Sequence, residues 1–225
     1  MKEELLELFK TPVTTIKKRA EEKNIKKEAI IALIIAAIIA ISSILTTYIT
    51  ITKTVNKVYN SFEDYKKSYS WNEDLTKAEF KKMKKEYKKG LFEDAELIEV
   101  FFKTLAITAI AIAVVAGILF VISRTVKSPK EYIEMISMAN SAFIIYLAGL
   151  IVQTIFSFIY DPIGIIILGG ATMFAIIALA NAFKESIEVE DTNKLVICSG
   201  IVLTIVYAIL IILVSNYIGN LFSIL

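Results

Sequence analysis

Long uncharged runs constrain this chain most strongly. Residues 29–51 are 23 consecutive uncharged positions, with lysines on both sides. A helix needs about 20 apolar residues to cross a bilayer, whereas the apolar part of an export signal has about 7 to 15. The run therefore predicts a membrane span rather than a cleaved signal or a buried core helix. The charged segment before it, residues 1–28, is predicted to be a retained cytoplasmic leader.

Four more runs without a charge follow the first and are long enough to cross a membrane. They are residues 104–123, 135–160, 162–183 and 195–225. The chain is 56% hydrophobic, which leaves little sequence for a soluble domain and disfavours a large soluble helical protein. We expect an all-α polytopic membrane protein with five transmembrane helices and an extramembrane helical hairpin. Residues 29–225 would form one membrane domain, with spans at 29–51, 98–123, 132–160, 162–183 and 195–222.

Lysine and arginine in short loops set the expected orientation, because positively charged loops stay on the cytoplasmic side. The leader carries eight such residues, and the loops after the second and fourth spans add Arg124, Lys127, Lys130, Lys184 and Lys194. The turn after the third span and the tail after the fifth have none. This distribution predicts a cytoplasmic N-terminus and an extracytoplasmic C-terminus. Residues 52–97 run against the rule, since they would lie outside with eleven lysines.

Residues 52–97 are predicted to form a lysine-rich helical hairpin. Apolar and aromatic residues recur at three- and four-residue steps over residues 55–69, so the first span should continue outward as an amphipathic helix. A turn is expected at residues 70–72. A second helix should begin at Thr76, whose spacing to Glu79 is that of a capping box, and Gly90 offers its end.

An aromatic seam is expected between the two helices of the hairpin. It consists of Tyr59, Phe62, Tyr65, Phe80, Met83 and Tyr87. The seam would pack the helices together, and the alternative is a surface that binds a ligand or a partner.

The leader has an amphipathic pattern of its own, with Leu5, Leu6, Phe9, Val13, Ile16 and Ala20 on one side. Pro12 suits the first position of a helix capped by Thr11, so two short helices with a bend are predicted. Such helices fit the inner headgroup region of a membrane. Docking on a partner protein is the alternative that the sequence leaves open.

Several kinds of chemistry are excluded by composition. The chain has no histidine and one cysteine, Cys198, so histidine-based proton transfer, Cys/His zinc sites and internal disulfides are absent. The segment GIIILGGA lacks the lysine and the spacing of a phosphate-binding loop. We expect no enzymatic activity, no catalytic residue, no metal, no cofactor and no nucleic-acid partner.

Polar residues inside the expected spans are the candidate site. An amide in hydrocarbon needs hydrogen-bond partners, and pairing between helices is the expected role, with a substrate path as the alternative. Lys103 should extend toward the outer interface and pair with Glu99 one turn earlier. The candidate intramembrane polar contacts are Lys103, Asn140, Gln153, Asn181 and Asn216.

The chain resembles the Yip1 domain family of integral membrane proteins. The resemblance rests on the leader LFKTPVTTIKKRAEE, the five expected spans, the Asp161-Pro162 turn and the segment ALANAF before a short acidic loop. It implies an integral membrane protein. Eukaryotic relatives are associated with small GTPases and membrane traffic through an N-terminal extension with a DLYGP-like motif. This sequence lacks that motif, so GTPase binding is not implied, and other five-span families, including the maltodextrin-utilisation-associated one, remain alternatives.

Two kinds of function are consistent with these features. The first is a non-enzymatic scaffold or accessory subunit that engages membrane lipids, or a protein partner through the leader or the outer hairpin. The second is a small transporter or channel component with the amides along its path. The 23 lysines against 2 arginines and the abundant isoleucine suggest a bacterial source, and hence the plasma membrane.

Overall fold

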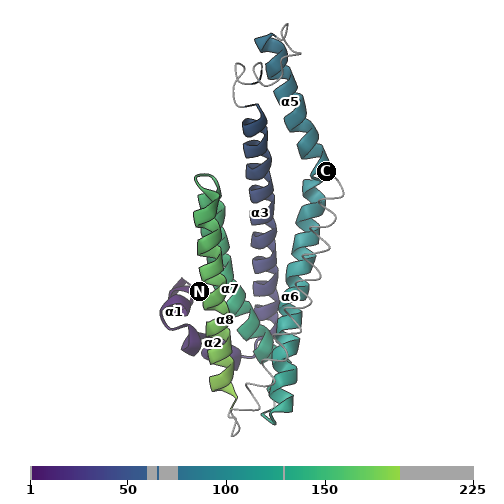
Figure 1. Cartoon of the computed structure of the whole chain (residues 1–225). Coiled ribbons are helices and arrows are strands. Elements are labelled where there is room, and N and C mark those ends of the chain that lie inside the picture. The colour runs from purple at the N-terminus through teal and green to yellow at the C-terminus, as the bar shows by residue number, and fades with distance from the viewer. Residues whose placement is uncertain (1, 60–64, 66–75, 129, 188–225) are drawn as a thin grey trace. The chain divides into compact units, whose positions relative to one another are not determined.

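The chain is helical in every element that the structure describes. The computed structural model describes residues 2–59, 65, 76–128 and 130–187 (Figure 1). The helices are α1 (Lys2–Lys10), α2 (Pro12–Glu21), α3 (Ile25–Val58), α5 (Lys77–Asp94), α6 (Leu97–Thr125), α7 (Tyr132–Ser157) and α8 (Asp161–Ser186). The fifth expected span at residues 195–222 lies outside the described residues, as does Asn216.

Four segments of the described chain are long and apolar enough to cross a membrane. They are Ile25–Val58, Lys77–Thr125, Tyr132–Ser157 and Pro162–Ser186. The prediction of an all-α fold with several apolar spans is therefore confirmed. The count of five spans and the outer hairpin remain predictions.

The leader bends between α1 and α2. Pro12 occupies the first turn of α2, where its missing N–H costs nothing, as the sequence predicts. Thr11 is the N-cap residue of α2, but its side chain does not cap that helix. The Thr11 hydroxyl donates instead to the carbonyl of Glu7 at 3.3 Å, so it satisfies the end of α1 rather than the start of α2. The expected Thr11 cap is therefore wrong.

Helix α5 begins as predicted and ends later than predicted. Thr76 accepts from the Glu79 backbone N–H at 3.3 Å, and the Glu79 carboxylate accepts from the Thr76 N–H at 2.9 Å, which completes the capping box. The expected end at Gly90 is wrong, because the helix continues to Asp94. A glycine inside a helix costs about 1 kcal/mol, which its strongly helix-forming neighbours offset. The break comes at Glu96, whose backbone is left-handed (φ 42°).

The chain forms two compact units, and each is described by itself. Unit 1 comprises Met1–Ile25, Ala113–Ser141 and Ile177–Leu225. Its described part contains the leader, the end of α6, the start of α7 and the end of α8. The Tyr132 hydroxyl donates to the Ala113 carbonyl at 2.9 Å and its ring meets Phe120 edge-on, so the start of α7 lies against α6. The buried apolar residues of unit 1 are Leu8, Ile16, Ala20, Ala116, Leu119, Ile122, Met135, Met138, Ala139, Ala178, Ala182, Phe183 and Ile187.

Unit 2 comprises Lys26–Ile112 and Ala142–Ile176. Within it, α7 and the start of α8 approach closely at two glycines. A Cβ atom on Gly149 would overlap the side chain of Ala171, and one on Gly164 would lie 2.9 Å from the Gln153 carbonyl oxygen. These pairs run in opposite directions along the two helices, so α7 and α8 are antiparallel. Glycine is required at both positions because the backbones leave no room for a side chain.

Candidate functional site

The leader is docked on the membrane helices of unit 1 rather than lying free. Helix α2 buries four residues on one side: Thr15, Ile16, Arg19 and Ala20. In α1, Leu8 is buried as well. Burial of this side of α2 is typical of a helix that packs against other parts of a protein. Here the leader packs within unit 1.

Ion pairs tie the leader to the start of α7 and to the end of α8. Lys17 Nζ lies 3.4 Å from Glu185 Oε2 at the end of α8. Lys23 Nζ lies 2.7 Å from Glu131 Oε1 and 3.0 Å from Glu134 Oε1, at the start of α7. The hydrogen bonds that Lys23 donates to the Glu131 and Glu134 carboxylates hold the pKa of Lys23 above its ordinary value. These charged contacts fix the direction of α2 on unit 1.

Helix α1 leaves an apolar face uncovered. Leu5, Leu6 and Phe9 are 41%, 54% and 44% exposed. They lie within two turns of one helix, so they form one small patch. The predicted apolar side of the leader is therefore divided. Ile16 and Ala20 face protein, whereas the α1 residues face outward because the bend at Thr11 turns α1 relative to α2.

Small polar side chains are buried where α6 ends and α7 begins. Ser123, Ser137, Asn140 and Ser141 are each at most 2% exposed. The Ser123 hydroxyl donates to the Phe120 carbonyl at 2.8 Å, and the Ser141 hydroxyl donates to the Ser137 carbonyl at 2.9 Å. Serines that bond to their own helix let neighbouring backbones approach, so Ser123 and Ser141 serve packing.

In unit 2, aromatic side chains join α5 to the end of α3. The Tyr59 and Tyr65 rings stack with centroids 5.3 Å apart, and Phe80 lies 5.5 Å from Tyr59 and 5.2 Å from Tyr65. Tyr87 also contacts Tyr59. We call Tyr59, Tyr65, Phe80 and Tyr87 the aromatic cluster. Five of the six expected seam residues thus lie at or beside this contact, since Met83 packs against it, and the sixth, Phe62, lies outside the described residues.

A second contact between α3 and α5 sets their direction. The Tyr48 and Phe92 rings lie 5.1 Å apart, and Lys88 Nζ lies 5.3 Å from the Tyr48 centroid. Tyr48 lies within α3 and Tyr59 directly follows its end, whereas Phe92 follows Phe80 in α5. The two helices are therefore antiparallel and side by side.

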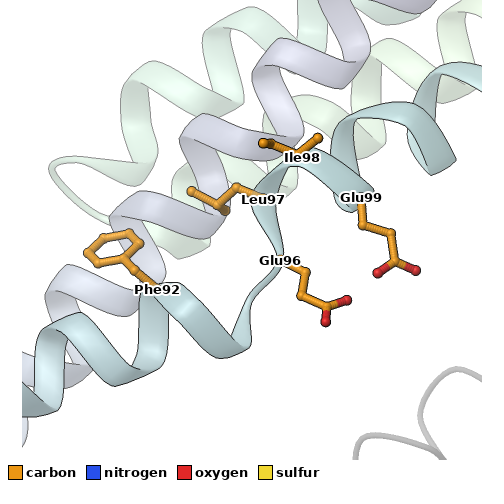
Figure 2. A pocket seen from close by; sticks show the side chains of 5 residues that line it. All are labelled: Phe92, Glu96, Leu97, Ile98 and Glu99. Atoms are coloured by element: carbon orange, nitrogen blue, oxygen red, sulfur yellow. The ribbon is translucent and has the colours of Figure 1, made fainter.

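A shallow pocket of about 500 Å³ lies at the junction of α5 and α6. Phe92, Glu96, Leu97, Ile98 and Glu99 line it, and Figure 2 shows the two carboxylates pointing away from Phe92 and Leu97. Glu99 pairs with Lys103. Within the described residues, no group of three or more His, Cys, Asp or Glu side chains could hold a metal ion. The pocket is therefore not a candidate metal site.

The predicted site residues are not gathered at one place. Asn140 is fully buried and Asn181 is exposed, both in unit 1. In unit 2, the Gln153 amide donates to the Ser157 hydroxyl of its own helix at 3.2 Å. Lys103 is exposed and pairs with Glu99, as its spacing predicts. Whether any of them binds a substrate stays a prediction.

The charged residues that hold the leader were not predicted as a site. Lys23 and Glu131 are separated by 108 positions, and Lys17 and Glu185 by 168. No local spacing rule joins residues so far apart. The available signal was the cluster of acidic residues directly before α7 and at the end of α8, opposite a lysine-rich leader.

These features define a helical membrane protein whose leader packs on its own apolar helices. Comparison with protein families agrees with this class. A model of the Yip1 domain matches residues 6–213, which is most of the chain, so the protein belongs to the Yip1 domain family. No curated protein and no solved structure matches the chain significantly.

Proposed function

We propose that this protein is a non-enzymatic scaffold or accessory subunit of the bacterial plasma membrane, which engages lipids or partner proteins through its leader and its lysine-rich segment. Its N-terminus would be cytoplasmic and its C-terminus extracytoplasmic. Membership of the Yip1 domain family supports a membrane protein without an enzymatic role.

One observation carries the proposal: α1 exposes Leu5, Leu6 and Phe9 while α2 is held on the membrane helices. Burying a large apolar side chain is worth about 1.5 to 3 kcal/mol, so this patch favours an apolar surrounding. Unit 1 holds the leader beside helices that can cross a membrane. The boundary between the lipid headgroups and the acyl chains is therefore the nearest apolar environment for α1.

The transporter alternative has less support. A path for a polar solute needs several polar groups along one route. Gln153 bonds within its own helix and Asn181 is exposed, so the amides in the described part of the chain do not suggest such a route.

Two measurements on the reconstituted protein test the proposal. A photoactivatable lipid with its reactive group at headgroup depth should label α1, and mass spectrometry locates the label. Changing Leu5, Leu6 and Phe9 together to serine should abolish labelling, whereas Lys18→Gln, an exposed change in α2, should preserve it. The liposomes should also show no solute flux above protein-free liposomes. Solute flux above that of protein-free liposomes would contradict the proposal. Labelling of α1 that is unchanged when Leu5, Leu6 and Phe9 are all changed to serine would contradict it as well.

A further inference from the structure

We propose that one side of α5 binds a phosphate-rich polyanion in the aqueous phase. This inference names a partner class for the lysine-rich segment and in that respect rests on the proposed function. It concerns unit 2, whereas the lipid contact of α1 concerns unit 1.

The surface is a row of four lysines on α5. Lys77, Lys81, Lys85 and Lys89 follow one another at four-residue steps, and all four side chains are exposed. Residues four apart are neighbours on a helix, so their ammonium groups form one ridge about 18 Å long at 1.5 Å per residue. We call these residues the lysine ridge.

Charge on α5 is segregated rather than mixed. Glu79, Glu86 and Glu93 recur at seven-residue steps and lie on a different side of the helix from most of the ridge. Ion pairs form where the two sides meet, with Lys82 3.9 Å from Glu86 and Lys89 3.3 Å from Glu93. Lys81 and Lys85, in the middle of the ridge, have no ion-pair partner within the described residues.

The ridge is unfavourable for the helix by itself. Like charges four residues apart destabilise a helix by about 0.2 to 0.5 kcal/mol per pair, and the ridge has three such pairs. A bound polyanion would remove that repulsion. The α5 residues Phe80, Met83 and Tyr87 pack toward the end of α3, and none of them belongs to the ridge.

The composition of this side favours a polyanion over a protein partner. Protein interfaces are enriched in aromatic residues and depleted in lysine. Here the aromatic residues of α5 lie against α3, and the ridge presents ammonium groups. Lysine binds phosphate as a point charge, and each neutralised phosphate releases counterions.

The direction of α5 favours a soluble polymer over a bilayer surface. Helix α3 has 34 residues, about 51 Å at 1.5 Å per residue, which exceeds the roughly 30 Å of a hydrocarbon core. The contact between Phe80 and Tyr59 places the start of α5 beside the end of α3, beyond the uncharged run, where Lys53 and Lys57 occur, whereas Phe92 near the end of α5 lies beside Tyr48. Because α5 runs along α3, the ridge points along the axis of a span. A flat membrane surface would meet only one end of it, whereas an extended polymer can contact every lysine.

The test uses the full chain in an uncharged detergent and inorganic polyphosphate as the probe. Fluorescence anisotropy of labelled polyphosphate gives the affinity at several salt concentrations. The ridge variant changes Lys77, Lys81 and Lys85 to glutamine, which has similar helix propensity. The control variant changes Lys26, Lys127 and Lys184 to glutamine, so it loses the same charge from exposed lysines outside α5.

The wild type and the control should bind polyphosphate alike. The ridge variant should bind at least ~10-fold more weakly at moderate salt, with a salt slope shallower by about 2, at roughly 0.7 for each lost contact. Its thermal stability should not fall, because repulsion within α5 is removed. Equal losses in both variants, or no loss in the ridge variant, would overturn the proposal.

Two further probes separate the alternatives. Poly-glutamate that binds as tightly as polyphosphate, with the same dependence on the ridge, would overturn the proposal in favour of an acidic protein. Ridge-dependent binding to phosphatidylglycerol vesicles alone would overturn it in favour of a lipid surface. If the lysine ridge does not bind polyphosphate but the lipid probe labels α1, only the polyanion proposal is rejected. If the lipid probe does not label α1 but the ridge binds polyphosphate, the proposed lipid contact of the leader is rejected.

Discussion

Lys23 and Glu131 form an ion pair across 108 positions of the sequence, with 2.7 Å between Nζ and Oε1. The contact joins the end of the leader to the residues just before α7. Lys23 also has a left-handed backbone (φ 48°), so the chain turns sharply between α2 and α3 where the ion pair forms. Lys23 thus links the position of the leader to the start of α7 in unit 1.

The contribution of Lys23 to leader docking should depend on alkaline pH. The pKa of Lys23 is raised by its hydrogen bonds to Glu131 and Glu134, so the folded state favours the charged form. The contribution is present below the ordinary lysine pKa of 10.5 and is lost as the pH rises through the raised value. Hydrogen exchange over α2 should be faster in Lys23→Gln than in wild type near neutral pH, and the difference should vanish at strongly alkaline pH. Lys18→Gln is the control, and a difference that persists in alkali would contradict this account.

Gly149 should tolerate no side chain, whereas Gly169 should. A Cβ on Gly149 would overlap Ala171, but one on Gly169 would meet nothing within 4 Å. Gly149→Ala should lower the melting temperature because α7 and α8 must separate. Gly169→Ala should be neutral or stabilising by up to about 1 kcal/mol, from helix propensity. Equal melting temperatures for the two variants would show that the close approach is absent.

The aromatic cluster should hold α5 against α3. Phe80→Ala removes a ring that contacts Tyr59 and Tyr65, and it should destabilise this contact by about 1 to 3 kcal/mol, less than the ~3 to 5 of a fully buried phenylalanine. Exchange of α5 amide protons should rise accordingly. Lys82→Ala, on an exposed part of the same helix, should have little effect. Unchanged exchange in Phe80→Ala would mean that the cluster does not hold the helices together.

The two unit 1 amides should differ in their effect on stability. Asn140 is fully buried, so Asn140→Leu should alter thermal stability by about 0.6 to 2 kcal/mol, as expected for a polar contact between membrane helices. Asn181 is exposed, so Asn181→Leu should leave stability nearly unchanged. A larger effect at Asn181 would indicate that it has a partner among the helices.

Helix starts were predicted correctly where they depend on residues within one helical turn. The Thr76 and Glu79 capping box and the Pro12 helix start depend on residues at most four positions apart, and both are present. The predicted end at Gly90 was wrong because glycine is only an unfavourable helix residue. Packing of the next residue, Leu91, against the buried cluster of Val55, Tyr59 and Tyr65 favours a continued helix. The break came at Glu96, which no composition rule marks.

Long-range contacts could not be predicted in the same way. The sequence indicated an amphipathic leader but not that Ile16 would be buried while Leu6 is exposed, since this depends on how the leader packs within unit 1. The pairing of Lys17 with Glu185 likewise follows from the fold. Asn140 is buried and Asn181 is exposed, and no local sequence pattern around either residue indicates this difference.

The central claim is that the leader, held on unit 1, places the exposed face of α1 in the membrane interface. Spin labels on cysteines at Leu6 and at Lys18, with Cys198→Ser, test it directly in liposomes. We predict that the label at residue 6 is the more accessible to oxygen, which concentrates in lipid. The label at residue 18 should be the more accessible to a water-soluble nickel reagent. Equal access of the nickel reagent to both labels would contradict the claim.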